Sequence, residues 1–256
     1  MKLHVQHIGN GPMTAAFLHG LFGQGRNFTS MAKELGDVAT WSLIDLPNHG
    51  HSPWSRHFSY RHDVAAVAAV LRRSKKPWTL VGHSLGGKVA MLLALTHPQL
   101  VSQLVVLDTA PRTHKVSACT VAALAGLRRI NLARLATRAE ADELLTESCP
   151  DRAMRALLLQ NLRREQVGWS WGANFDMLAA ALGDIACWPE PKKPYQPFTK
   201  PTLWITGQRS SMVEDGDDTA MEQLFPELTR VVVPVGHLVH AEAPEAVATA
   251  IRGFIA

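Results

Sequence analysis

The sequence predicts an α/β protein with one mostly parallel central sheet, helices on both faces and a helical insertion. Between residues 13 and 108, apolar runs with strand character alternate with segments of helical periodicity, which is typical of parallel strands covered by helices. Strand signals disappear from residue 109 to 200 and resume afterwards. We therefore expect a core of residues 1–108 and 201–256, interrupted by a helical cap or lid of residues 109–200.

The elements of this core are expected in alternating order along the chain. Strands are expected at residues 13–18, 38–44, 78–81, 104–107, 202–205 and 230–233. Helices are expected at residues 27–35, 60–72, 84–96, near 219–224 and at 244–255, with helical periodicity in the insertion at 121–136, 139–147 and 154–164. The helix at 84–96 should end before His97-Pro98, because proline cannot continue a helix.

Composition and charge exclude several classes of protein. The chain has 256 residues, of which 46% are hydrophobic and 19% charged, as in ordinary globular proteins with a sizeable core. Its first residues lack the basic-then-apolar pattern of a secretory signal, and no apolar run approaches the roughly 18 residues of a membrane span. We expect a cytoplasmic, soluble protein without membrane insertion.

Neither the basic residues nor the cysteines indicate a special partner. The net charge of +4 is modest, and the basic residues are not clustered with aromatic ones, so no nucleic-acid binding is expected. The three cysteines, Cys119, Cys149 and Cys187, are odd in number and lack metal-binding spacing, which predicts reduced thiols. The sequence does not specify an oligomeric state.

A G-x-S-x-G pentapeptide at residues 82–86 places Ser84 between an apolar run and a helix. A serine on so tight a strand-to-helix turn is held in a strained conformation, and the helix N-terminus offers N–H groups to a developing oxyanion. A helix-capping serine is the simpler alternative. A phosphate-binding loop is a third, because residues 82–88 also spell G-x-x-x-x-G-K, but Val89 stands where that loop needs Ser or Thr.

Four motifs together resemble the α/β-hydrolase family, and within it the compact YbfF-type bacterial esterases. They are HGLFG at residues 19–23, DLPNHGHS at 45–52, GHSLGGK at 82–88 and GH at 236–237. The resemblance covers nearly the whole chain and implies a serine hydrolase that cleaves small carboxylic esters or thioesters. It implies Ser84 as the nucleophile, an oxyanion hole made by the amides of Leu21 and Leu85, and no metal or organic cofactor.

The resemblance also selects the general base. His237 follows the expected strand at 230–233 and precedes the last helix, where the family keeps this histidine. His240 is the nearest competitor among the twelve histidines, but the family's Gly-His pair corresponds to Gly236-His237. We predict His237 as the base.

The acid departs from the commonest family pattern. Most members read G-x-x-D after the strand that corresponds to residues 202–205, whereas this chain has Ser210 in the place of the aspartate. A serine cannot supply the negative charge that orients the histidine. The YbfF-type esterases similarly use the acid of a Leu-Asp-x-Ala-Pro motif, which implies Asp108 here, and Glu214 and Asp215 are the alternatives.

The insertion is expected to cover Ser84, because loops at the carboxyl ends of parallel strands form the binding site in such sheets. It contains 13 Lys or Arg and 9 Asp or Glu, so it accounts for the whole net charge of +4. Its arginines are predicted either to attract an anionic leaving group, such as that of an acyl-coenzyme A, or to form solvated helix faces. The arginines considered are Arg128, Arg129, Arg134 and Arg138.

Aromatic residues of the insertion are candidates for substrate binding. Trp169, Trp171 and Phe175, with Met177 close by, are predicted to line an acyl pocket. The alternative is that these side chains form the core of the insertion itself.

Two histidine pairs, His49-x-His51 and His237-x-x-His240, lack a nearby carboxylate or cysteine at ligand spacing, so no metal site is expected. Asn48-His49-Gly50 is interpreted as a structural turn beside the site.

Two other functions stay open. In the first, the triad serves cofactor-free haloperoxidation, carbon–carbon bond hydrolysis or a lyase reaction, and in the second, the fold acts as a non-catalytic receptor.

Overall fold

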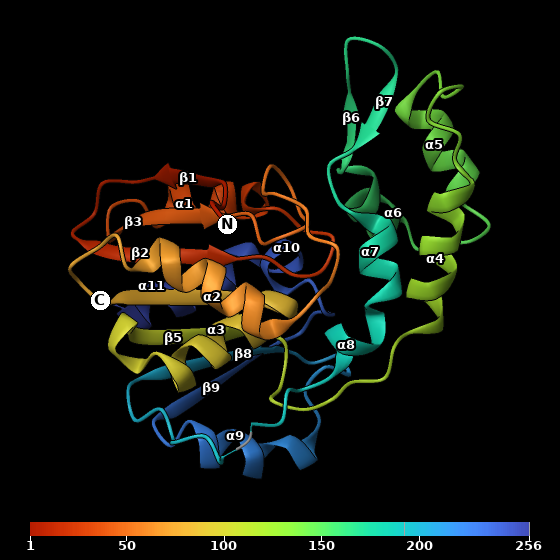
Figure 1. Cartoon of the computed structure of the whole chain (residues 1–256). Helices are drawn as coiled ribbons and strands as arrows, with labels where there is room; N and C mark the ends of the chain where they lie inside the picture. The colour runs from red at the N-terminus through yellow and green to blue at the C-terminus, as the bar shows by residue number, and fades with distance from the viewer. Residues whose placement is uncertain (192, 256) are drawn as a thin grey trace.

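The computed structural model describes residues 1–191 and 193–255 and confirms the predicted fold class (Figure 1). A seven-stranded sheet has the order β1-β3-β2-β4-β5-β8-β9, and only β1 runs antiparallel to its neighbour. The strands are β1 (Val5–Ile8), β2 (Met13–Leu18), β3 (Ala39–Ile44), β4 (Trp78–His83), β5 (Val101–Leu107), β8 (Thr202–Gly207) and β9 (Leu228–Val233).

Among the described residues, six α-helices belong to the core and five to the insertion. The core helices are α1 (Thr29–Glu34), α2 (Tyr60–Leu71), α3 (Leu85–Thr96), α9 (Asp218–Leu224), α10 (Val239–Glu242) and α11 (Pro244–Ile255), with 3₁₀ turns η1 (Gly25–Phe28), η2 (Pro98–Leu100) and η3 (Asp215–Asp217). The insertion contains α4 (Ala118–Arg129), α5 (Arg138–Leu145), α6 (Arg152–Leu159), α7 (Phe175–Ala180) and α8 (Leu182–Ala186).

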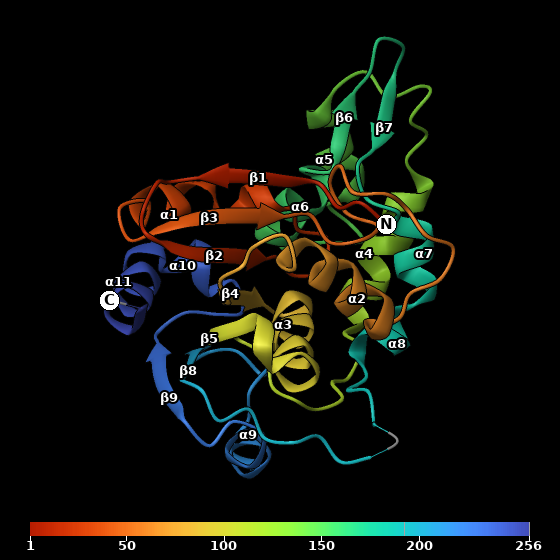
Figure 2. The same cartoon turned by 60° about the vertical axis from the view of Figure 1, so that its left-hand side comes forward.

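Alternating side chains of the strands bury both faces of the sheet. In β5, Val106 packs into one apolar cluster and Leu107 into the other, as the two-residue period of a strand requires. The first cluster is covered by α2, α3 and α9, and the second by α1, α10 and α11 (Figures 1 and 2). Because both faces are buried, the central strands are almost continuously apolar.

Helix α3 follows the turn after β4 and is buried in the middle of the molecule. Residues 85–95 are all buried, because α3 packs against β4, β5 and α2. It ends at Thr96, as expected from the proline at position 98. The first residue of α3 therefore has a fixed position relative to the carboxyl ends of β4 and β5.

The insertion contains a β-hairpin that the sequence did not predict. Strands β6 (Leu162–Arg164) and β7 (Trp169–Trp171) pair antiparallel, so the expectation of a strand-free insertion is wrong. The helix expected at residues 154–164 ends at Leu159 instead. The side-chain amide of Asn161 donates to the carbonyl of Phe22 in the core (2.8 Å), and the Asn161 carbonyl accepts from the Gly172 amide (2.7 Å). These tertiary contacts override the helical periodicity.

Two other differences lie near chain ends and turns. Strand β1 was not predicted, because a four-residue edge strand with polar positions gives a weak signal and depends on pairing with β3. The helix expected at 121–136 ends at Arg129, where Ile130 turns to an extended conformation and the Asn131 side chain accepts from the Ala133 amide (3.1 Å).

The last helix of the insertion is fastened to the core by polar groups of α2 and α3. Lys88 Nζ donates to the carbonyls of Ala186 (2.7 Å) and Cys187 (3.1 Å), and the Tyr60 hydroxyl donates to the carbonyl of Ile185 (2.6 Å). Burial lowers the pKa of Lys88 to about 8. The lysine of the G-x-x-x-x-G-K run thus binds carbonyl groups at the C-terminus of α8, which is the favourable end for a cation.

The helices and the hairpin of the insertion lie together beside the carboxyl ends of the core strands (Figure 1). Across the part of the chain that the structure describes, every helix is too short or too polar to cross a membrane.

Candidate active site

Ser84 lies at the junction of β4 and α3 in a strained backbone conformation. Its φ of 51° and ψ of −115° are unfavourable for a residue with a side chain, and its amide donates to the Leu107 carbonyl (3.1 Å). The flanking positions, 82 and 86, have no room for a side chain and therefore require glycine. A Cβ on Gly82 would lie 2.4 Å from the Gly86 carbonyl oxygen, and one on Gly86 would lie 2.3 Å from the Leu18 carbonyl oxygen. The pentapeptide is therefore a tight strand-to-helix turn.

Asp108 follows the adjacent strand β5 and is completely buried. It too has a positive φ, of 50°, and its amide donates to the Ile205 carbonyl (2.8 Å). Its carboxylate accepts hydrogen bonds from the Gly207 amide (2.8 Å) and from the Ser210 hydroxyl (2.5 Å). These donors compensate the carboxylate for the loss of water.

His237 completes this arrangement from the loop after β9. Its Nδ1 lies 2.7 Å from Asp108 Oδ2, so the ring donates its Nδ1 proton to the carboxylate. The other ring nitrogen, Nε2, is then left as a proton acceptor. His237 and Ser84 line the same cavity. The structure thus joins Asp108 to His237 by a hydrogen bond and places Ser84 on the same cavity as His237.

The alternative acids lie elsewhere. Glu214 is exposed and pairs with Arg112 (2.8 Å), and Asp215 is exposed in η3. Ser210, which stands where most family members have an aspartate, instead donates to Asp108. The carboxylate of this chain thus follows the neighbouring strand β5, and Ser210, at the common family position after β8, donates a hydrogen bond to it.

The amides of Leu21 and Leu85 are the groups predicted to form the oxyanion hole. Both residues line the cavity beside Ser84, and within residues 1–191 and 193–255 neither amide donates a hydrogen bond. The Leu85 amide is the first of α3, which has no acceptor inside the helix. Both N–H groups are therefore available to a negatively charged oxygen in the cavity.

Two buried histidines hold the turn that carries Leu21. His49 Nε2 accepts from the Phe22 amide (3.1 Å), and His19 Nδ1 donates to the Gly20 carbonyl (2.8 Å). Burial lowers the pKa of His49 to about 3 and also lowers that of His19. Because His49 stays neutral at neutral pH, its Nε2 keeps its lone pair for Phe22. The sequence indicated a structural turn at His49 but not this contact.

His83 and His240 pack around His237 as neutral rings. His83 Nε2 donates to the backbone carbonyl of His237 (2.9 Å), and its ring centroid lies 4.6 Å from that of His240. Burial lowers the pKa of His240 to about 4 and that of His83 well below its usual value. His240 also lines the cavity, but its Nδ1 has no hydrogen-bond partner among the described residues, whereas His237 has a carboxylate.

Glu242 binds the backbone amides of the two residues on either side of His237. Its carboxylate accepts from the Gly236 amide (2.9 Å) and from the Leu238 amide (3.2 Å). Arg209 lies 3.6 Å from the same carboxylate and also donates to the Pro234 carbonyl. Sequence reasoning missed this residue, because its role depends on backbone groups rather than on a side-chain motif.

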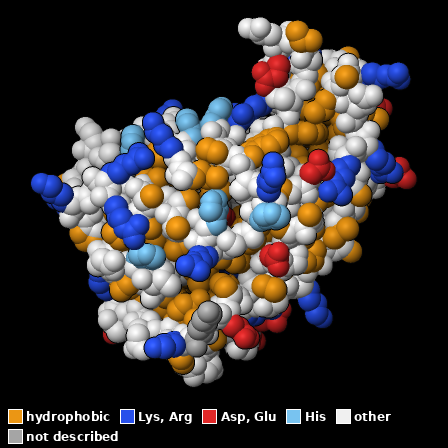
Figure 3. Space-filling view, viewed as in Figure 1, with side chains coloured by type: hydrophobic (Ala, Val, Ile, Leu, Met, Phe, Trp, Pro, Cys, Tyr) orange, Lys and Arg blue, Asp and Glu red, His pale blue; other side chains and the backbone are white. Residues whose placement is uncertain are grey.

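The cavity has a volume of about 670 Å³ and extends from Ser84 under the insertion. Figure 3 shows hydrophobic side chains gathered on the insertion near its border with the core. The apolar residues that line the cavity come from the core and the insertion and include Leu21, Tyr60, Val116, Met154, Leu157, Leu182 and Ile185. An apolar chain attached to a reacting carbonyl therefore has a place to bind.

The predicted aromatic pocket differs from this cavity. Trp169, Trp171 and Phe175 are not among its lining residues. Phe175 is buried against Trp171 (ring centroids 5.1 Å apart) and against Phe22 (5.6 Å). These side chains form the core of the insertion, because the β6–β7 hairpin and α7 pack together around them.

The arginines predicted to attract an anionic leaving group also lie outside the cavity lining. Arg128 pairs with Asp176 (2.9 Å), and Arg138 donates to the carbonyls of Leu159 and Leu162. Arg129 and Arg134 are likewise not lining residues. Two of these four arginines, Arg128 and Arg138, thus bind other residues of the insertion.

Comparisons with known proteins identify the family of the chain. Residues 16–244 match the family model described as the alpha/beta hydrolase fold. The chain is 34% identical over 248 residues to the mouse sn-1-specific diacylglycerol lipase ABHD11, covering 94% of this chain and 80% of that protein. It is 27% identical to the ethanol acetyltransferase 1 of Eremothecium cymbalariae, covering 92% and 72%. The chain therefore belongs to the α/β-hydrolase fold family.

A solved structure is similar over the whole chain. The structure described as a marine microorganism esterase superposes with a TM-score of 0.94 at 28% identity and covers 99% of both chains. The insertion is thus part of an arrangement found in a known esterase structure.

Exchange of the acid tests the assignment of Asp108. In Asp108→Asn the side-chain amide donates to His237 Nδ1 and stabilises the wrong tautomer, so kcat for an ester should fall by about 10⁴-fold. Adding Ser210→Asp to this variant restores a carboxylate at the common family position and should recover part of the activity. Steady-state kinetics on both variants measure this. Full activity in Asp108→Asn would contradict the assignment.

Glu242→Gln tests the support of the His237 loop. A glutamine oxygen can replace one of the two hydrogen bonds of the carboxylate, so about 1.4 kcal/mol is lost and kcat should fall roughly tenfold with KM little changed. Glu245→Gln, an exposed change of the same charge in α11, is the matched control. An unchanged kcat and pH profile in Glu242→Gln, equal to those of the control, would rule out a positioning role.

Proposed function

We propose that this protein is a serine hydrolase that cleaves carboxylic esters through an acyl-enzyme, with Ser84 as nucleophile, His237 as base and Asp108 as acid. The observation that carries the proposal is the bond between Asp108 and His237 beside a cavity that also contains Ser84 and two available amides. The names of the mouse lipase and of the marine esterase support ester hydrolysis.

The first half-reaction forms an ester on Ser84. Its hydroxyl oxygen attacks the substrate carbonyl carbon while His237 Nε2 takes the hydroxyl proton. The negative charge on the carbonyl oxygen is stabilised by the amides of Leu21 and Leu85. When the carbon–oxygen bond to the leaving alcohol breaks, the imidazolium of His237 returns its proton to that alcohol. Asp108 stabilises the imidazolium throughout.

The second half-reaction releases the acid. His237 takes a proton from a water molecule, which attacks the acyl carbon, and the same two amides again bind the oxyanion. Breaking the bond to Ser84 returns the proton to its hydroxyl oxygen. The reaction consumes one ester and one water and yields one acid and one alcohol. The chain's own residues supply every group used in these steps.

The cavity supports substrates with an apolar acyl chain. Its volume of about 670 Å³ and its lining by Val116, Met154, Leu157, Leu182 and Ile185 suit a chain of several carbons better than an acetyl group alone. The mouse relative is named for a diacylglycerol substrate, which carries two acyl groups. Thioesters with such chains stay within the proposed class. A cytoplasmic location stays a prediction from the sequence.

The rival functions share the fold but differ in the reaction that is catalysed, or in having none. Haloperoxidase, carbon–carbon hydrolase and lyase chemistry would use the same three residues, and a receptor would need none of them as a unit. The joint presence of the strained Ser84, the Asp108–His237 bond and the available amides argues against a receptor, because binding alone requires no such arrangement.

Pre-steady-state kinetics with p-nitrophenyl acetate, butyrate, octanoate and laurate test the proposal. We expect a stoichiometric burst of p-nitrophenol, with higher kcat/KM for butyrate and octanoate than for acetate. Ser84→Ala should lower kcat by roughly 10⁶-fold. Ser30→Ala, on the exposed side of α1, is the matched control and should retain full activity. Absence of turnover with all four esters in wild type would refute the proposal.

A further inference from the structure

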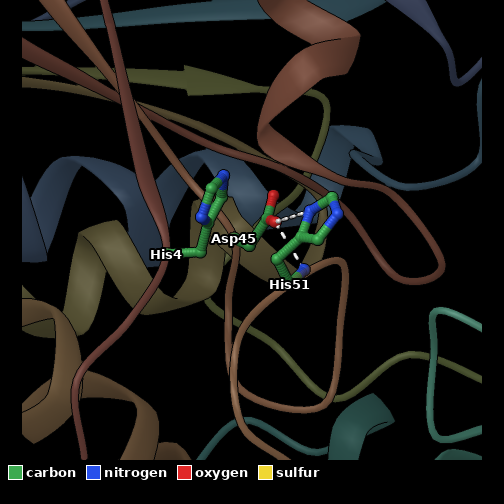
Figure 4. A group of neighbouring side chains, drawn as sticks. All are labelled: His4, Asp45 and His51. Carbon is green, nitrogen blue, oxygen red and sulfur yellow. Dashed lines mark hydrogen bonds and ion pairs between the residues drawn. The ribbon is translucent and has the colours of Figure 1, made fainter.

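A second group of polar side chains lies on the surface away from Ser84. His4, from the segment before β1, and Asp45 and His51, from the turn that follows β3, meet in a small hollow (Figure 4). One nitrogen from each ring and a carboxylate oxygen lie within 4.8 Å of one another. The distance between His51 Nδ1 and Asp45 Oδ2 is 3.7 Å. None of the three residues lines the cavity that contains Ser84.

These spacings are close to those of a zinc site. Zinc binds histidine nitrogen at about 2.0–2.1 Å and carboxylate oxygen at about 2.0–2.2 Å, so two ligand atoms at a tetrahedral ion are about 3.3–3.5 Å apart. The three donor atoms, which lie within 4.8 Å of one another, need to approach by up to about 1.5 Å. Rotations of the two exposed histidine side chains suffice for this, because their χ angles are not fixed by burial.

Hydrogen bonds hold the chain before β1 and the turn after β3 against each other in the absence of an ion. The Asp45 amide donates to the His4 carbonyl (3.1 Å). The Ser52 hydroxyl accepts from the His4 amide (2.9 Å) and donates to the Asp45 carbonyl (2.6 Å). The Asp45 carboxylate is oriented by the amides of Gly25 (2.7 Å) and His51 (2.8 Å). A ligand would thus meet a largely preorganised set of donors.

The carboxylate has capacity left for an ion. Each of its oxygens has two lone pairs, and each accepts one amide hydrogen bond, so one lone pair per oxygen is unused. Two neutral imidazoles and one carboxylate give the group a net charge of −1. His51 has 58% of its side chain exposed, so a dissolved ion can reach the donors. Nitrogen and oxygen donors in this ratio favour zinc over calcium or magnesium.

Two neighbouring arginines oppose a cation, because the positive charges of Arg163 and Arg26 both act on His51. Arg26 lines the same hollow, although one of its nitrogens donates to the Gln160 carbonyl (2.8 Å). Its positive charge should weaken the binding of a divalent cation without preventing it. This makes Arg26 a useful probe, because removing its charge should act opposite to removing a ligand.

We propose that His4, Asp45 and His51 bind one Zn²⁺ ion, with water as the fourth ligand. The ion would join the segment before β1 to the turn that follows β3 and so stabilise the edge of the sheet. This inference revises the sequence-based expectation of no metal site, which considered only ligands close together in the sequence. It does not depend on the proposed ester hydrolysis, since none of the three residues takes part in that reaction.

Calorimetric titration of untagged protein with ZnCl₂ tests the proposal. A Cys119→Ser/Cys187→Ser background removes the two exposed thiols, which also bind zinc. In this background we expect one ion per chain and a higher Tm with zinc. His4→Ala and His51→Ala should each weaken binding about tenfold or more, whereas His57→Ala, an exposed histidine outside the group, should not. Arg26→Ala should bind zinc more tightly.

Cobalt provides a second measurement that is independent of stability. Co²⁺ in the same background should give the visible absorption of a four-coordinate ion, and this absorption should be lost in His51→Ala. No saturable binding of one ion, or binding that survives in the His4→Ala/His51→Ala double variant, would overturn the proposal. The rate of ester hydrolysis by these variants is tested separately, so failure of the metal site leaves the proposed function unaffected.

Discussion

The candidate active site depends on one buried carboxylate, that of Asp108. A fully buried negative charge is strongly unfavourable unless hydrogen-bond donors surround it. Its donors come from the end of β8 at Gly207, from the following loop at Ser210 and from the loop after β9 at His237. The same three bonds that make the charge tolerable also fix the histidine ring beside the cavity. The orientation of the proposed base therefore depends on the correct packing of β5, β8 and β9 in the sheet.

Around this carboxylate, side chains that take no part in the proposed reaction fix the backbone. His49 and His19 hold the turn that carries the Leu21 amide, and burial keeps their pKa values below the ordinary value, so they bind as neutral rings. Glu242 binds the backbone amides of the residues on both sides of His237. The rigid scaffold is thus built from backbone amides and carbonyls, and the reacting side chains are few.

The sequence predicted the parts of the molecule that depend on local pattern. The apolar strands, the turn at Ser84 and the helix after it follow from neighbouring residues, and the Leu-Asp motif indicated Asp108. Contacts between distant segments were not predictable in this way. The Asn161 side chain ends α6 by binding the core, and Phe175 turns toward Trp171 rather than the cavity. Both outcomes are set by tertiary packing, which leaves no periodic signal.

Nuclear magnetic resonance of the His237 ring tests the central claim most directly. If Asp108 orients the base, the resting enzyme carries its imidazole proton on Nδ1, and a strongly hydrogen-bonded proton correlates with that nitrogen in a ¹H–¹⁵N spectrum. We expect this Nδ1 proton in wild type. A resting imidazole protonated mainly on Nε2, with Nδ1 free of a hydrogen bond, would contradict the account.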